Sequence, residues 1–137
     1  MVNVRFSLYR RTMSQDSRFA LLAGSLLAAT GIVLGAFGAH GLRAHLAPEA
    51  VGWWQTGVQY QMWQAIGLVA IGAAPIPRSR GPAWLLAAGT LIFSGSLYAM
   101  ALSGARWLGA VTPVGGVLMI AGWAWLAWRL AKAPALP

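Results

Sequence analysis

Four long apolar segments, separated by short polar stretches, dominate the pattern of the chain. They cover about residues 19–39, 55–74, 83–103 and 109–129. A helix of about 20 residues rises roughly 30 Å, which matches the hydrocarbon core of a bilayer. The pattern therefore predicts an all-α membrane protein whose single domain, residues 19–130, is a bundle of four transmembrane helices. Residues 1–18 are expected to form a basic amino-terminal tail, and residues 131–137 a short carboxyl-terminal tail.

The second segment differs from the others because its first half is polar. The stretch Gln55–Gln64 holds four glutamines, one threonine and one tyrosine, and the chain becomes uniformly apolar only after it. Hydrocarbon offers an amide no hydrogen-bonding partner, so we expect the deeper glutamines to bond to neighbouring helices. Trp53 and Trp54, just before this stretch, are predicted to mark the membrane interface.

Polar side chains of the other segments are predicted to meet these glutamines in the outer half of the bundle. Two interpretations stay open: a hydrogen-bond network that holds the helices together, or a polar pocket that opens to the outside. Polar residues inside helical membrane proteins commonly link helices, which favours the first interpretation. The residues of this network or pocket are His40, Gln61, Gln64, Ser94, Tyr98 and Thr112.

Small residues recur at helical spacing along the apolar segments. The third segment, for example, carries Gly95, Ala99 and Ser103 at intervals of four. Small residues at such intervals let helix backbones approach closely, and this close packing drives association in lipid. The glycines expected at helix contacts are Gly24, Gly31, Gly35, Gly95 and Gly116.

Composition and charge agree with a membrane location. Hydrophobic residues make up 58% of the chain and charged residues only 9%, whereas soluble domains are about 25% charged. The net charge of +8 comes from basic residues that flank the apolar segments, so we expect contact with lipid and no binding of nucleic acid. Four of them are predicted to contact inner headgroups: Arg78, Arg80, Arg129 and Lys132.

The distribution of basic residues predicts the orientation of the chain. The amino-terminal tail, the second loop and the carboxyl-terminal tail hold eight of the ten, and the first and third loops hold Arg43 and Arg106. Loops rich in lysine and arginine stay on the cytoplasmic side. Both termini are therefore expected in the cytoplasm.

The residues available for chemistry are few. The chain has no cysteine, and its two acids, Asp16 and Glu49, lie outside the apolar segments. His40 and His45 are five residues apart and do not share a helical face, so no metal site or cofactor is expected. The serines of the third segment have no histidine or lysine at comparable depth to activate them. We expect a protein that is not an enzyme.

Several motifs give the chain a resemblance to a known family. They are GAFGAHGL (residues 35–42), YQMWQA (60–65), FSGSLY (93–98), TPVGG (112–116) and the pair Gly122-Trp123. With these motifs the chain resembles the YgdD/YwdK family of small bacterial inner-membrane proteins of unknown function, which is similar to the animal transmembrane protein 256 group. The resemblance implies a multi-pass protein of the cytoplasmic (inner) membrane and no particular reaction. The family motif has a histidine where this chain has Gln64, which cannot titrate.

Three functions remain compatible with these patterns. The first is an accessory or assembly subunit that packs against a larger membrane complex or forms a homo-oligomer. The second is an oligomeric channel or transporter for a small uncharged solute, lined by the outer polar residues. The third is a structural protein that interacts with lipid through its basic residues.

Overall fold

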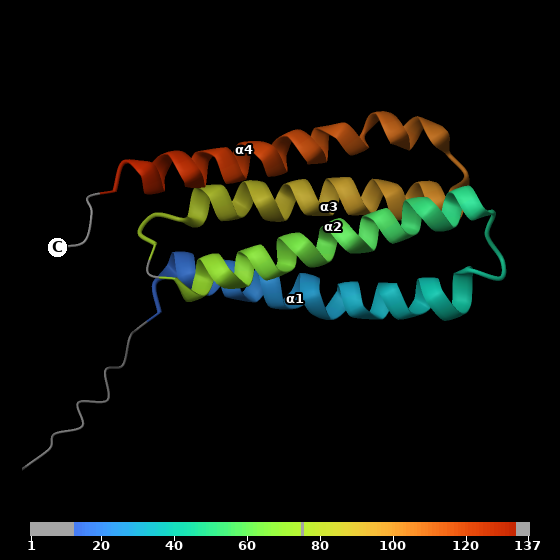
Figure 1. Cartoon of the computed structure of the whole chain (residues 1–137), viewed down its shortest axis with the longest axis horizontal. Coiled ribbons are helices and arrows are strands. Elements are labelled where there is room, and N and C mark those ends of the chain that lie inside the picture. The colour runs from blue at the N-terminus through green and yellow to red at the C-terminus, as the bar shows by residue number, and fades with distance from the viewer. Residues whose placement is uncertain (1–12, 75, 134–137) are drawn as a thin grey trace, which may run out of the picture.

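The computed structural model describes residues 13–74 and 76–133, which form four long helices lying side by side in alternating directions (Figure 1). These helices are α1 (Gln15–Phe37), α2 (Pro48–Ala73), α3 (Arg80–Ser103) and α4 (Thr112–Ala131). The π-helical turn η1 (Gly38–Leu42) extends α1, and the 3-10 turn η2 (Arg106–Ala110) precedes α4. The prediction of an all-α fold is confirmed. Residues 1–12 and 134–137 of the two predicted tails lie outside the described residues.

The first helix begins earlier than its apolar pattern predicts. Ser14 caps it, since its side-chain oxygen accepts a hydrogen bond from the backbone N–H of Ser17 at 3.1 Å. Asp16 in the first turn adds a negative charge where the helix dipole favours one. Polar residues that hydropathy assigns to a tail therefore form the first turn of α1.

The second helix begins at Pro48 instead of residue 55. A proline is well tolerated in the first turn, because no N–H is needed there, and Glu49 beside it again suits the dipole. The early start places Trp54 inside α2, where it is 3% exposed and its indole N–H donates to the Leu34 carbonyl of α1 at 2.9 Å. The expectation that Trp54 faces the membrane interface is thus wrong, because this side chain belongs to the α1–α2 contact.

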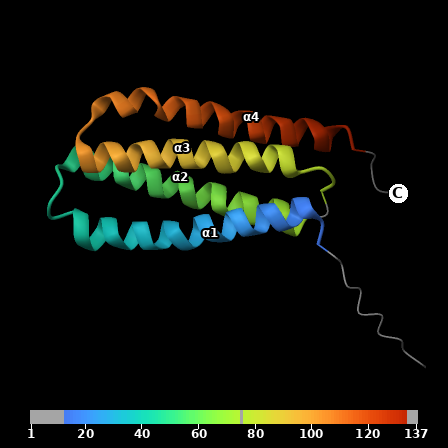
Figure 2. The ribbon, with the colours of Figure 1, turned by 180° about the vertical axis from the view of Figure 1, so that it is seen from behind.

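The packing of the helices departs from a closed ring of four. α1 packs along α2, α2 along α3 and α3 along α4, and α1 also touches α3. Among the described residues, the backbone of α4 comes close only to α3 and η2 (Figures 1 and 2). The buried residues of α4 form a narrow stripe that is wide enough for one neighbouring helix. These residues are Gly115, Met119, Gly122 and Leu126.

Three of the described helical segments are long and apolar enough to cross a membrane: Gln15–Leu42, Arg80–Ser103 and Arg106–Ala131. The fourth helix, α2, has sufficient length, but its glutamines lower its hydropathy. It nevertheless lies between α1 and α3 over most of its length (Figure 1). The start of α1, the α2–α3 turn and the end of α4 all lie at one end of the molecule.

Candidate functional site

Gln61, in the middle of α2, joins three helices through its side-chain amide. The side chain is 4% exposed, and its nitrogen donates to the Leu27 carbonyl of α1 at 2.8 Å and to the Thr30 hydroxyl at 2.9 Å. Its oxygen accepts a hydrogen bond from the Tyr98 hydroxyl of α3 at 2.8 Å. Both amide hydrogens and the amide oxygen are therefore used. Tyr98 belongs to the predicted set, whereas Thr30 was not predicted.

Two serines connect α3 to its two main neighbours. The Ser94 hydroxyl donates to the Gly57 carbonyl of α2 at 2.7 Å. The Ser96 hydroxyl lies 2.7 Å from the Thr112 hydroxyl at the start of α4, and the two share a hydrogen bond. These bonds take up hydroxyls that would otherwise be available to line a pore.

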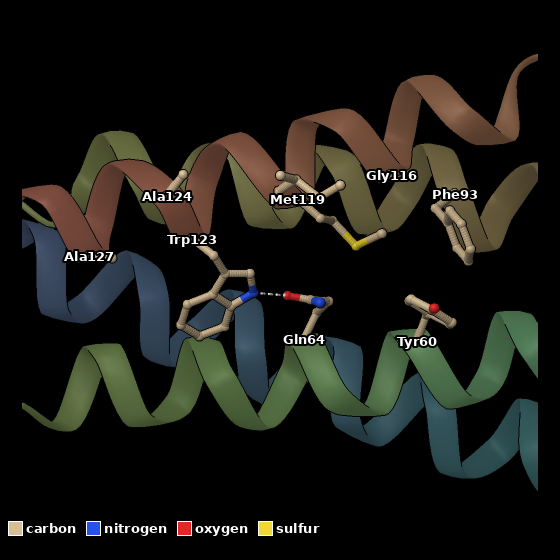
Figure 3. A pocket seen from close by; sticks show the side chains of 9 residues that line it. Tyr60, Gln64, Phe93, Gly116, Met119, Trp123, Ala124 and Ala127 are labelled. Atoms are coloured by element: carbon tan, nitrogen blue, oxygen red, sulfur yellow. Dashed lines mark hydrogen bonds between the residues drawn. The ribbon is translucent and has the colours of Figure 1, made fainter.

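Gln64 lies three residues beyond Gln61 and faces α4 instead of α1. Its side-chain oxygen accepts a hydrogen bond from the Trp123 indole N–H at 2.9 Å (Figure 3). Because an indole N–H can only donate, the amide oxygen must face Trp123 and the amide nitrogen must point away from it. Within the described residues, this nitrogen donates to no acceptor. The only fully buried side-chain nitrogen or oxygen without a hydrogen-bond partner in this part of the chain is the Ser79 hydroxyl, so the Gln64 nitrogen is not fully buried. The Gln64 nitrogen is therefore open to its surroundings.

His40 stands apart from the other predicted residues. It lies exposed in η1, at the end of the molecule opposite the termini, and takes part in none of the hydrogen bonds among the described residues. The predicted set of six thus divides into a link around Gln61 and Tyr98, the serine links, the Gln64–Trp123 pair and an isolated histidine. The midpoint of α2 falls between Tyr60 and Gln61, so the two glutamines lie near the middle of this helix, and their depth in a membrane stays a prediction.

Two of the predicted glycines form the close contact between α1 and α2. A Cβ atom at Gly24 would lie 2.8 Å from the Ala65 carbonyl oxygen, and one at Gly31 would lie 2.6 Å from the Met62 sulfur. Real Cβ atoms do not approach so closely. A side chain at Gly24 would force the two helix backbones apart, whereas one at Gly31 would have to displace the flexible Met62 side chain.

The other three predicted glycines make looser contacts or none. A Cβ at Gly35 would lie 3.3 Å from Val58, and one at Gly116 would meet the Phe93 ring at 3.8 Å, an ordinary contact distance. A Cβ at Gly95 would have nothing within 4 Å among the described residues. Gly95 is therefore exposed and lies at no helix contact within the described chain, contrary to its prediction.

The tightest contact between α3 and α4 involves glycines that were not predicted. A Cβ at Gly89 would lie 2.7 Å from the Gly115 carbonyl oxygen, and one at Gly115 would lie 2.6 Å from the Gly89 carbonyl oxygen. Gly115 directly precedes the predicted Gly116, so the motif was recognised but the wrong neighbour was chosen. Only the rotation of α4 about its axis distinguishes the two.

A groove of about 620 Å³ lies between α2 and α4, and Phe93 of α3, which runs behind α4 in this view, also lines it (Figure 3). It exists because α4 packs on α3 without reaching the backbone of α2. Its walls are apolar and aromatic, and the rings of Tyr60 and Phe93 lie 4.6 Å apart at one end. The lining residues are Tyr60, Gln64, Phe93, Gly116, Met119, Ile120, Trp123, Ala124 and Ala127.

The four basic residues predicted to contact headgroups lie at one end of the molecule. Arg78 and Arg80 flank the α2–α3 turn, and Arg129 of α4 donates to the Pro77 carbonyl of that turn at 3.3 Å. The Lys132 ammonium lies 4.2 Å from the centre of the Trp128 ring. The end of the molecule that carries both described termini is therefore positively charged.

Together, the apolar helices and the interhelical hydrogen bonds define a class, a multi-pass helical membrane protein, and the relatives place it in the inner membrane. Residues 34–116 match the family described as "Protein of unknown function (DUF423)". The chain belongs to this family, and its resemblance to the YgdD/YwdK proteins is confirmed.

Curated relatives cover most of the chain. The UPF0382 inner membrane protein YgdD of Escherichia coli is 42% identical over 114 residues, which is 79% of this chain and 86% of the relative. The UPF0382 membrane protein YwdK of Bacillus subtilis is 39% identical over 75% of this chain and 88% of its own length. The UPF0382 membrane protein SH2409 of Staphylococcus haemolyticus is 43% identical over 75% and 87%, respectively. No solved structure matches the chain.

Proposed function

We propose that this protein is a non-catalytic subunit that spans the membrane four times, has both termini in the cytoplasm, and packs against a larger membrane complex. The observation that carries the proposal is an exposed face of small residues on α3. Gly95, Ala99 and Ser103 recur at intervals of four and are all exposed. The Ser103 hydroxyl donates to the Ala99 carbonyl of its own helix at 2.6 Å, so the face presents no unpaired hydroxyl.

Such a face is suited to close contact with a second helix. Small residues allow two helices in lipid to pack with a short distance between their axes. The van der Waals contacts formed at this distance stabilise the association. Gly24 and Gly115 are covered by neighbouring helices, whereas a Cβ at Gly95, as at Gly52, would have nothing within 4 Å among the described residues. A helix from another chain is the partner that this face fits.

The central polar residues favour a packing role over a channel. Gln61, Ser94 and Ser96 each bond to a neighbouring helix, which is how polar residues hold membrane helices in register. The basic end of the molecule is consistent with cytoplasmic termini and with contact to anionic headgroups. The solute channel and the lipid-binding structural protein stay predictions without a comparable observation.

The test is a pull-down of the tagged, full-length protein in a gentle detergent, followed by a native gel and mass identification. We expect a co-migrating membrane protein in constant ratio, and its loss in Gly95→Leu. Gly52→Leu is the matched control, because Gly52 is also exposed and a Cβ there meets nothing within 4 Å among the described residues. A protein that migrates alone, or a partner that Gly95→Leu retains, would overturn the proposal. A complex of identical chains would replace the larger complex with a homo-oligomer.

A further inference from the structure

The polar groups that line the groove between α2 and α4 belong to two residues of α2, Gln64 and Tyr60. The side chain of Gln64 is 9% exposed, and its amide nitrogen opens into the groove while its oxygen is held by Trp123 (Figure 3). Tyr60, four residues earlier and on the same face of α2, lines the groove too. Among the described residues, neither the Tyr60 hydroxyl nor the Gln64 nitrogen has an acceptor. The residues that line the groove therefore include two with a free donor, Tyr60 and Gln64, among apolar and aromatic side chains.

These donors lie near the mid-depth of the helices. Gln64 is close to the middle of α2, Phe93 to the middle of α3 and Trp123 to the middle of α4. At that depth the surrounding lipid consists of hydrocarbon tails, which provide no acceptor, and an unpaired donor there is costly. The ester carbonyls of phospholipids lie near the edge of the core, about 15 Å from its centre. A phospholipid tail can fill the groove but cannot satisfy its donors.

The occupant that fits is a membrane-soluble molecule with an uncharged acceptor on an apolar ring. A quinone has this chemistry, because its flat ring carries carbonyl oxygens and its tail is a hydrocarbon. The aromatic rings of Tyr60, Phe93 and Trp123 suit the faces and edges of such a ring. The volume of about 620 Å³ falls within the ~300–1,000 Å³ typical of small-molecule sites.

We propose that this groove binds a lipid-soluble quinone, with a ring carbonyl accepting from the Gln64 amide nitrogen and the Tyr60 hydroxyl. The bond from Trp123 fixes the orientation of the Gln64 amide, so that the amide nitrogen faces the ligand. The proposal concerns binding alone and includes no electron transfer. It is independent of the association through α3, which lies on a different set of residues.

Gly116 provides a way to block the groove without disturbing the helices. It lines the groove, and a Cβ there would meet only the Phe93 ring, at 3.8 Å. Gly116→Leu should therefore fill the space with little effect on the α3–α4 contact. Gly52→Leu, at an exposed glycine outside the groove, is the matched control.

The experiment measures quenching of tryptophan fluorescence by decylubiquinone, with the full-length protein in nanodiscs of dioleoyl phosphatidylcholine. Among the tryptophans of the described residues, Trp123 alone lines the groove, and it is 38% exposed. We expect saturable quenching in the native protein and in Gly52→Leu, and its loss in Gly116→Leu. Gln64→Leu should weaken binding about three- to tenfold, the factor of one net hydrogen bond, whereas Gln64→His should keep a donor and bind. Decylbenzene, which has the ring and the tail but no carbonyl, should not compete.

Three results would overturn the proposal. Quenching that rises without saturation, or equally in Gly116→Leu, would show that the quinone is dissolved in the lipid and not bound. Competition by decylbenzene at the same concentration would show a purely apolar groove. A disulfide dimer of Ala124→Cys that forms equally with and without decylubiquinone would show that a helix of a second copy occupies the site. If Gly116→Leu fails to fold, as judged by circular dichroism, the affinities of Gln64→Leu and Gln64→His for decylubiquinone provide the test. Equal affinities in these two variants would then overturn the proposal.

Discussion

At the scale of single residues, Gln61 is the side chain that makes the largest number of interhelical hydrogen bonds among the described residues. It bonds to Leu27 and Thr30 of α1 and to Tyr98 of α3. Hydrogen bonds between membrane helices contribute about 0.6 kcal/mol each on average, so the three together are expected to contribute about 2 kcal/mol. Removing the amide also leaves the Tyr98 hydroxyl without its acceptor in a region that lipid surrounds.

We predict that Gln61→Leu inserts normally but lowers the free energy of unfolding by about 2 kcal/mol, because three interhelical hydrogen bonds are lost. The measurement is thermal unfolding in detergent, followed by circular dichroism. Gln59→Leu is the control, since Gln59 is exposed on the same helix and makes no hydrogen bond among the described residues. An unfolding midpoint that is equal in Gln61→Leu and the native protein would contradict a stabilising role for the amide.

The sequence predicted that the buried amides need partners, but not which partners they find. Gln61 and Gln64 are only three residues apart, and yet one bonds to α1 and α3 and the other to α4. Thr30 carries no sequence signal that distinguishes it from other threonines in apolar segments, and the Gly122-Trp123 motif does not show which residue the Trp123 indole would bond to. Their roles depend on how each helix is rotated about its axis, and that rotation is a property of the packed helices.

At the scale of the helices, the α3–α4 contact depends on a pair of glycines. Gly89 and Gly115 bring the two backbones so close that a Cβ on either would lie under 3 Å from the carbonyl oxygen of the other. Among the described residues, α3 provides the main contact of α4, and this glycine pair is the closest backbone approach within that contact. The neighbouring Gly116 faces the groove and has room for a side chain.

We therefore predict that Gly115→Ala destabilises the protein by about 1–3 kcal/mol, the usual cost of overpacking a tight contact. Gly116→Ala is the matched control and should leave stability nearly unchanged, because its Cβ would sit at an ordinary distance from Phe93. Thermal unfolding of the two variants in the same detergent provides the comparison. If both variants unfold at the same temperature, the close approach at Gly115 does not hold α4 in place.

At the scale of the whole molecule, the basic residues of the turn between α2 and α3 and of the end of α4 gather at the end that carries both described termini, which supports the proposed cytoplasmic termini. The start of α1, the α2–α3 turn and the end of α4 share one end, and that end carries Arg78, Arg80, Arg129 and Lys132 (Figure 1). The opposite end carries an exposed ion pair, in which Arg106 lies 2.8 Å from Glu49 and so has a negative partner. Lysine and arginine in short loops favour the cytoplasmic side, so the excess of basic residues at the end with both described termini is the reason to expect that end in the cytoplasm.

We predict that a membrane-impermeant maleimide labels Ala44→Cys in intact cells and labels Ala133→Cys only after the membrane is opened. Both alanines are exposed and lie at opposite ends of the molecule, and the chain has no native cysteine to interfere. Labelling of both variants in intact cells would show an even number of crossings between the two sites, whereas the three helices α2 to α4 predict three. The reverse pattern would place the termini outside.

The sequence alone determined the class of this protein, because length and hydropathy are local properties of each segment. It determined the membrane location, the all-α fold and the four helices, although capping by Ser14 and the start at Pro48 shifted two boundaries. Only the tertiary structure decided which faces of those helices are covered. In the packed structure, Gly115 is covered, Gly95 is exposed and a groove lies beside Gln64. These three features depend on how each helix is rotated and on contacts between residues far apart in the chain.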